Sequence, residues 1–142
     1  MYRYKRPAFD ALCVHEDEVD QLPACGTLLA SNEMSRVQAA IMRDGDRSSW
    51  GVQYHPEFDL ATIAAIISTR VQRHLDEGLA RSADDVAKIV DDYRALATNT
   101  SRPDLAWKYG LGGDVLDPVI RTLEFRSWLT ADVLPYANRH AA

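Results

Sequence analysis

The sequence predicts an α/β protein in which short, mostly antiparallel strands are followed by a helical C-terminal region. Up to Asp59, apolar residues occur in short runs that often alternate with polar residues and are interrupted by turn residues. After Asp59, apolar residues recur every three or four positions, which is typical of amphipathic helices. The chain has 142 residues, which fits one domain of ordinary size, or one domain with a tail.

Four short strands are expected in the first part of the chain. Asp44-Gly45-Asp46 is a turn signal, and Trp50, Val52 and Tyr54 would share one face of the strand that follows it. The connections are too short for helical crossovers, so the last three strands should be antiparallel neighbours. The expected strands span residues 9–14, 27–31, 37–42 and 50–54.

Four helices are expected in the second part, and each has recognisable end signals. The first would begin at Asp59 as N-cap and end at Gly78, and the second would begin at a capping box that starts with Ser82. Trp107 and Trp128 occupy apolar positions and are expected in the core, with an interface role as the alternative. The remaining helices would lie between Pro103 and Gly110 and between Asp117 and Pro135.

Composition excludes several classes of protein. Sixteen Lys and Arg against 21 Asp and Glu give a net charge of −5, which argues against a nucleic-acid partner. No apolar run approaches the roughly 20 residues that span a bilayer, and the N-terminus has no apolar signal segment. Two cysteines make no disulfide framework. We therefore expect a cytoplasmic protein with no membrane partner and no cofactor.

The sharpest chemical feature is the segment from Trp50 to Phe58, which contains His55-Pro56-Glu57. Pro56 favours an extended preceding residue, and residues i and i+2 of an extended segment point to the same side. His55 and Glu57 could then lie side by side, with the carboxylate orienting the imidazole as in the base half of a nucleophilic triad. The alternative is structural, since Pro followed by Glu also opens helices.

The acidic loop around His15 and Asp17 suggests a second kind of site, a metal site. A histidine among clustered carboxylates could bind a divalent cation, although the spacing matches no specific metal motif. A solvated charged loop is the more frequent case. No metal site is therefore predicted.

Several segments together resemble the C-terminal half of class I, triad-type glutamine amidotransferase domains, with the nearest likeness to bacterial stand-alone domains related to the amidotransferase part of GMP synthase. The likeness covers about residues 9–58. The most specific segment is Gly51-Val-Gln-Tyr-His-Pro-Glu-Phe58. The segments that carry the likeness are His15-x-Asp17-x-Val19-x-x-Leu22-Pro23, Leu29-Ala-Ser-Asn32, Val37-Gln-Ala39 and Gly51–Phe58.

The resemblance implies an incomplete flavodoxin-like domain with a glutaminase half-reaction. In this family a cysteine thiolate attacks the side-chain amide of glutamine, and the ammonia released passes to an acceptor on a partner domain or subunit. By this likeness His55 would be the general acid/base, Glu57 its orienter, and His15 and Asp17 would belong to a loop that shapes the site. Residues 1–78 would be the C-terminal half of the domain and residues 79–142 a helical extension packed on it.

The chain departs from the family at the nucleophile. The family's Gly-x-Cys-x-Gly elbow and its glycine-rich oxyanion segment are absent from the 142 residues. Cys13 is expected to be a small apolar residue of a strand, and Cys25 lies in a turn after an acidic stretch that would raise its pKa. The chain alone is therefore expected to be inactive and to bind glutamine only when a nucleophile-bearing half completes it.

Three functional hypotheses follow. The leading one is an amidotransferase half that works with a partner subunit or as a homo-oligomer. The second is a non-catalytic interaction module, or a truncated remnant, in which the helices after Asp59 make the working surface. The third is a metal-dependent hydrolase that uses His15, Asp17, His55 and Glu57. The ammonia acceptor cannot be identified from the sequence. The 142 residues contain no phosphate-binding loop of the kind found in an ATP-using acceptor domain.

Overall fold

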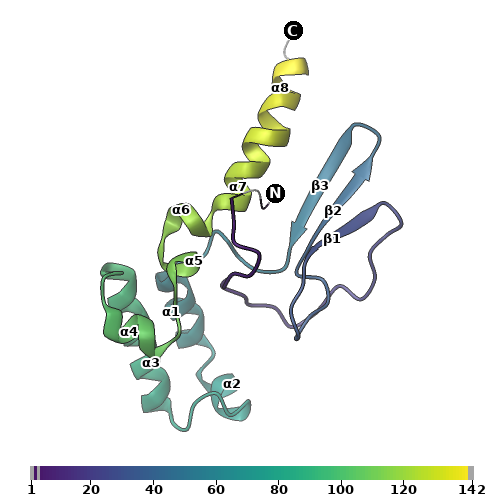
Figure 1. Cartoon of the computed structure of the whole chain (residues 1–142). Coiled ribbons are helices and arrows are strands. Elements are labelled where there is room, and N and C mark those ends of the chain that lie inside the picture. Colours follow the sequence, from purple (N-terminus) through teal and green to yellow (C-terminus); the bar gives the residue numbers. More distant parts are fainter. Residues whose placement is uncertain (1, 3, 141–142) are drawn as a thin grey trace. The chain divides into compact units, whose positions relative to one another are not determined.

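The computed structural model describes residue 2 and residues 4–140, with side chains to residue 139 (Figure 1). The chain forms two compact units. The sheet unit combines the described part of residues 1–6 with residues 11–56 and the described part of residues 123–142, and the helical unit comprises residues 7–10 and 57–122. No helix in the described part of the chain is long and apolar enough to cross a membrane.

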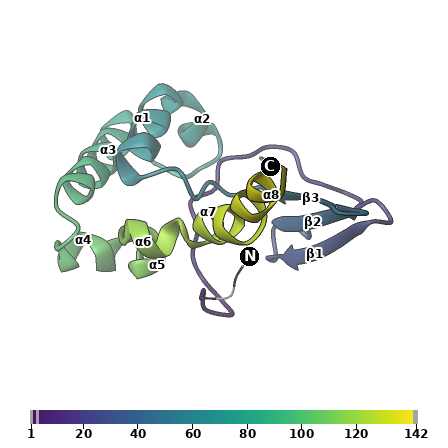
Figure 2. The same ribbon diagram turned by 90° about the horizontal axis from the view of Figure 1, so that it is seen from above.

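The sheet unit contains three strands in the order β1-β2-β3, all antiparallel, as the sequence predicted (Figures 1 and 2). Asp44 pairs with Arg47, so the β2–β3 hairpin has a two-residue turn, and Gly45 at its first position has a φ of 55°. Glycine adopts this left-handed conformation without the steric cost that a Cβ imposes. The strands are β1 (Gly26–Ala30), β2 (Ala39–Asp44) and β3 (Arg47–Val52).

The strand expected over residues 9–14 does not form. Among the described residues, its only ladder contact is a single antiparallel bridge between Cys13 and Tyr54. Next to this bridge, the His55 amide bonds to the Leu12 carbonyl at 2.8 Å. Asp10 interrupts the apolar run, and strand propensity depends strongly on the neighbours that a segment finds. The segment therefore lies against the end of the sheet without extending it.

The last helical stretch of the sheet unit contradicts the expected stop at Pro135. Pro135 is the second residue of α8 (Leu134–His140), which follows α7 (Leu123–Trp128) and a π-helical turn, η1 (Leu129–Val133). The Leu134 amide bonds to the Leu129 carbonyl, five residues earlier. This wider turn precedes the position where a proline ring would clash with a regular helix, so the chain stays helical.

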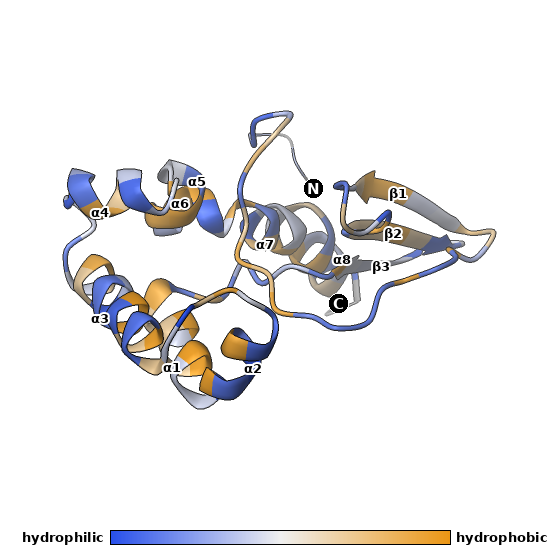
Figure 3. Ribbon diagram, turned by 90° about the horizontal axis from the view of Figure 1, so that it is seen from below, coloured by the Kyte–Doolittle hydropathy of each residue, from blue (hydrophilic) through white to orange (hydrophobic). Residues whose placement is uncertain are grey.

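The helical unit is built around α1 (Leu60–Thr69) and α3 (Ala83–Thr98), whose apolar faces carry the core (Figure 3). Ala64, Val86 and Val90 are buried together. Asp59 and Ser82 cap the two helices as predicted. Shorter helices complete the unit: α2 (Val71–Asp76), α4 (Pro103–Lys108), α5 (Gly113–Leu116) and α6 (Pro118–Arg121).

The single helix expected from Asp59 to Gly78 is divided at Arg70. The Arg70 amide bonds to the Ile67 carbonyl, three residues back, and the φ of Arg70 is −121°. The hydroxyls of Ser68 and Thr69 donate to the carbonyls of Ala65 and Ile66. Such side-chain bonds compete with the helical ladder. Gly78, with a φ of 70°, ends α2 as predicted.

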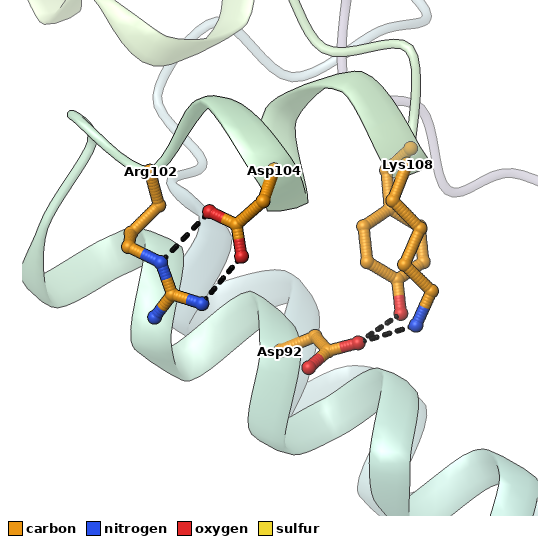
Figure 4. Close-up of polar contacts among 5 residues, drawn as sticks. Asp92, Arg102, Asp104 and Lys108 are labelled. Carbon is orange, nitrogen blue, oxygen red and sulfur yellow. Dashed lines mark hydrogen bonds and ion pairs between the residues drawn. The ribbon is translucent and has the colours of Figure 1, made fainter.

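Polar pairs join α3 to α4. Asp92 accepts hydrogen bonds from Lys108 at 2.6 Å and from the Tyr109 hydroxyl at 2.8 Å, and Figure 4 shows this carboxylate between the two helices. The Lys108 hydrogen bond, supported by that of Tyr109, holds the pKa of Asp92 below its usual value. Arg102 and Asp104 form a separate exposed pair.

The core expectation for Trp107 was wrong, because 87% of this residue is exposed. Leu105 is the buried residue of α4. Trp107 lies two positions further along, which is roughly 200° around a helix of 3.6 residues per turn. The alternative that the sequence allowed for Trp107, an interface role, stays a prediction.

The cap at Asp59 predicts a pH-dependent contribution to stability. Its carboxylate accepts from the Thr62 amide and hydroxyl, both at 2.8 Å, and the amide bond is the main reason its pKa is lowered. Because the folded pKa is depressed, the stabilisation is present above the unfolded pKa of about 4 and is lost as pH falls through the folded value. Asp59→Ala should cost about 1 kcal/mol at pH 7.

Thermal unfolding followed by circular dichroism between pH 7 and pH 2 measures this effect. The matched control is Asp59→Ser, which keeps a capping oxygen without a titrating group. The difference between wild type and Asp59→Ala should shrink below about pH 4, whereas the difference between Asp59→Ser and Asp59→Ala should not. A constant difference from wild type at all pH values would contradict the assignment.

Candidate active site

The end of β3 delivers His55 to the edge of the sheet unit. His55 is half-buried, and its amide is fixed to the Leu12 carbonyl at 2.8 Å. The preceding Tyr54 and the following Pro56 are both buried. Burial of the two neighbours, together with the backbone bond, determines where the chain leaves the sheet. The backbone of His55 is thus held in place by its own amide bond and by the buried residues before and after it.

Glu57 is exposed and is the first residue of the helical unit in this region, whereas His55 belongs to the sheet unit. Both residues take part in interactions within the structure. The structure differs from the extended segment that the sequence predicted, because Pro56 and Glu57 form a turn. The pairing of the Glu57 carboxylate with the His55 imidazole stays a prediction.

His15 lies in the exposed acidic loop, but its ring is fixed. Nδ1 donates to the backbone carbonyl of Asp17 at 2.8 Å, which leaves Nε2 as the acceptor facing the Gln38 side-chain amide at 3.4 Å. The same Gln38 amide lies 3.5 Å from Oδ1 of Asn32, which also accepts from the amides of Met34 and Ser35. Gln38 is buried. It therefore joins the loop of His15 to the turn after β1.

The sequence singled out His15 and Asp17 but not the role of Gln38. Its position between two apolar residues, Val37 and Ala39, could have indicated that Gln38 is buried. A buried polar side chain needs hydrogen-bond partners. Asp17 contributes its backbone carbonyl to this cluster, and its side chain is exposed. The described residues contain no group of three or more His, Cys, Asp or Glu side chains placed to hold a metal ion.

Both cysteines are exposed, and Cys13 forms an isolated bridge outside the named strands, so the expectation that Cys13 is a small apolar residue of a strand was wrong. Partial burial nevertheless raises the pKa of the Cys13 thiol, which lowers its thiolate fraction at neutral pH. Its sulfur lies 3.9 Å from Oε1 of Gln38 and from the Gln53 carbonyl. Cys25 lies in the turn before β1, where the Gly26 amide bonds to the Pro23 carbonyl. The environment of Cys13 therefore does not favour the thiolate that a nucleophile needs.

A buried polar network behind the end of β3 was not predicted from the sequence. Tyr54 donates to Oε1 of Glu124 at 2.8 Å, and Lys5 forms an ion pair with the same oxygen. The side chains of Lys5 and Glu124 are each only 1% exposed. The Tyr2 hydroxyl lies 2.7 Å from that of Tyr54. Because the Tyr54 proton goes to Glu124, Tyr2 is the donor to Tyr54.

This environment disfavours tyrosinate at both rings. Burial, followed by the contacts with Tyr2 and Glu124, raises the pKa of Tyr54 far above its usual value. Burial likewise raises the pKa of Tyr2 to about 12. Both hydroxyls therefore stay protonated at physiological pH and act as donors. Three aromatic residues of the sheet unit, Trp50, Phe125 and Trp128, line a pocket of about 180 Å³ together with Glu124.

The sequence did contain a weak signal for Glu124. Ile120, Glu124 and Trp128 follow one another at intervals of four, so Glu124 interrupts an apolar row. A carboxylate in such a position needs a buried partner. Lys5, 119 residues away in the sequence, could not be identified as that partner without the fold.

Comparison with known proteins identifies the family. The model of the family described as "Glutamine amidotransferase class-I" matches residues 1–71, which is half of the chain. The chain belongs to the class I glutamine amidotransferase family. The predicted resemblance is confirmed at the level of the family, and the small α/β structure with its antiparallel sheet is consistent with an amidotransferase-like domain. No solved structure matches the chain.

Two curated relatives extend the comparison. A protein of Pseudomonas sp. named gamma-glutamyl-L-1-hydroxyisopropylamide hydrolase is 28% identical over 142 residues, covering 98% of this amidotransferase-family chain and 47% of the relative. A subunit of the glutamine-hydrolysing GMP synthase of Sulfolobus acidocaldarius is 42% identical over 52 residues, covering 37% of the chain and 27% of that relative. The chain thus spans about half the length of the first relative and about a quarter of the second.

Proposed function

We propose that this chain carries the acid/base half of a γ-glutamyl amide-hydrolysing site. His55 is the general acid/base and Glu57 orients its imidazole. The observation that carries the proposal is the His55-Pro56-Glu57 segment at the exit of β3, within the part of the chain that the family model matches. The backbone bond from His55 to Leu12 and the buried neighbours supply the fixed position that proton transfer requires.

The proposed reaction is acyl transfer to a thiolate. His55 takes the thiol proton of a cysteine outside these 142 residues, and the thiolate attacks the amide carbon of a γ-glutamyl group. The C–N bond breaks as His55 gives that proton to the departing nitrogen. Water then hydrolyses the thioester, with His55 taking a proton from the water. Glutamate and ammonia, or glutamate and an amine, are the products.

Cys13 and Cys25 do not serve as the nucleophile in this proposal. Neither lies in a Gly-x-Cys-x-Gly segment, and the raised pKa of Cys13 opposes thiolate formation. The thiolate and the oxyanion-binding segment come instead from additional sequence of the same polypeptide or from a separate chain. Residues 1–78 correspond to the C-terminal half of the family's domain, with residues 79–142 as its helical extension.

The names of the relatives suggest two kinds of substrate. The GMP synthase relative is named as glutamine-hydrolysing and as one subunit of its enzyme, which supports glutamine as substrate and a partner subunit as ammonia acceptor. The Pseudomonas protein, whose similarity extends over the whole chain including the helices, is named for an amide with a substituted nitrogen. A substituted γ-glutamyl amide is therefore the second candidate substrate.

The direct test adds a nucleophile-bearing N-terminal half from a related domain to the purified chain. Ammonia release from glutamine, and amine release from γ-glutamyl isopropylamide, are measured with each half alone and with both together. We expect activity only in the mixture. Hydrolysis by the chain alone would refute the external nucleophile, and no activity from two folded halves would favour the interaction-module alternative.

A further inference from the structure

The buried network connects the candidate catalytic strand end to two distant parts of the sequence. Tyr54 directly precedes His55, Glu124 lies on α7, and Lys5 lies near the N-terminus. These three residues, like Tyr2, belong to the sheet unit. Glu124 lies outside residues 1–71, the part of the chain that the family model matches. The helical C-terminal region thus contacts the residue before His55 through the carboxylate of Glu124.

Strand geometry explains how Tyr54 could act on His55. Tyr54 lies two residues beyond the end of β3, where its antiparallel bridge with Cys13 keeps the backbone extended. Neighbouring side chains of an extended segment point to opposite faces. The Tyr54 hydroxyl is held from one side by its bond to Glu124, while the His55 amide is held by the Leu12 carbonyl. Fixing the Tyr54 ring therefore limits rotation of the strand end about its own axis, and that rotation is what would turn the His55 ring away from a substrate.

Stability alone does not explain the network. Moving a carboxylate and an ammonium out of water is expensive, and well-packed apolar residues often replace such pairs without loss. Glu124 also has an oxygen, Oε2, that is buried without a hydrogen-bond partner among the described residues. Such an arrangement favours a single position of the Glu124 side chain relative to Tyr54 and Lys5. Both donors bond to the same oxygen, Oε1, so a shift of either donor would break its bond.

We propose that Glu124 is a positioning residue that orients His55 through Tyr54. Lys5 keeps the Glu124 carboxylate in place, and Glu124 accepts the Tyr54 proton and so anchors the ring behind the strand end. The role of His55 itself rests on the function proposed above. The C-terminal region would then be part of the site and not only a cover for the sheet.

Amide hydrogen exchange of the full chain tests the positioning without any need for activity. The variants are Tyr54→Phe, which removes only the hydroxyl, and Glu124→Gln, which keeps the shape but not the charge. The His55 amide should exchange about tenfold faster in both variants, because losing a charge-assisted bond opens that segment locally. The Ile63 amide of the helical unit is the internal reference for both variants. The Gln53 amide, bonded to Gln38 in the same segment, is a second reference in Tyr54→Phe, where the Lys5–Glu124 pair stays intact.

A matched control variant is Asp92→Asn, which breaks an ion pair in the helical unit and should leave His55 exchange unchanged. The double variant Lys5→Met/Glu124→Leu replaces the buried pair with apolar side chains, and it keeps the test available if Glu124→Gln does not fold. It should also accelerate exchange at His55, because Tyr54 loses its acceptor. Equal acceleration at all three amides, or none at His55, would overturn the proposal.

The activity of the chain mixed with a nucleophile-bearing N-terminal half provides a second test. If His55 is misoriented, Tyr54→Phe should lower kcat and leave KM nearly unchanged, because the interaction is lost in the transition state and not in substrate binding. Selective exchange at His55 together with an inactive mixture would refute the proposed function but not the positioning. An active mixture with unchanged exchange and kcat in Tyr54→Phe would refute the positioning alone.

Discussion

Glu124→Ala is expected to destabilise the sheet unit by about 3–5 kcal/mol, because it leaves the Lys5 ammonium buried without its counter-charge. Both side chains are only 1% exposed, so water cannot replace the lost partner without a local rearrangement. The Tyr54 hydroxyl loses its acceptor in the same variant. Urea unfolding followed through the exchange of sheet amides, such as that of Gln53, would measure the change.

Two controls separate charge burial from lost packing. The double variant Lys5→Met/Glu124→Leu should recover most of the stability, since it removes both charges and fills the same space. Asp104→Asn removes one partner of the exposed pair with Arg102 and should have no measurable effect. If Glu124→Ala were as mild as Asp104→Asn, the buried pair would not exist in solution.

His55→Ala is expected to lower γ-glutamyl amide hydrolysis by the complemented enzyme by roughly two to four orders of magnitude. Without the imidazole, the cysteine thiol loses the base that converts it to the thiolate, and the departing nitrogen loses its proton donor. The loss should appear mainly in kcat. Ammonia release under saturating glutamine gives this value directly.

His74→Ala is the matched control, because His74 lies on α2 in the helical unit and the proposed mechanism does not use it. Glu57→Gln should also lower kcat, by less than His55→Ala, since an amide can still orient the imidazole but cannot stabilise its charged form. Equal activity of wild type and His55→Ala would remove the basis for the proposed function.

Local signals predicted much of the fold correctly. The hairpin follows from alternating residues around Gly45, whose positive φ suits the turn. Asp59 and Ser82 cap helices because their side-chain oxygens satisfy amides three residues away. The family could be recognised from short segments because they retain their order and spacing. These features depend on residues that are near one another in the sequence.

Predictions failed where a distant or competing contact decides the outcome. Pro135 lies inside a helix because a π turn precedes it, and the helix after Asp59 breaks at Arg70, where side-chain hydroxyls take up carbonyls of the last turn. Trp107 is exposed because Leu105 occupies the buried side of its short helix. Hydrophobicity alone does not show which of Leu105 and Trp107 is buried, because both are apolar and the helix period only places them on different sides.

The candidate site likewise combines features that depend on neighbouring residues with features that depend on distant ones. Local order and spacing along the chain were enough to predict the family, the hairpin and the His55-Pro56-Glu57 segment. Only the tertiary structure brought Lys5 and Glu124, 119 residues apart, to the residue beside His55. Such a pair leaves no periodic trace in a sequence, because a buried charge is stabilised by a partner that only the folded chain supplies.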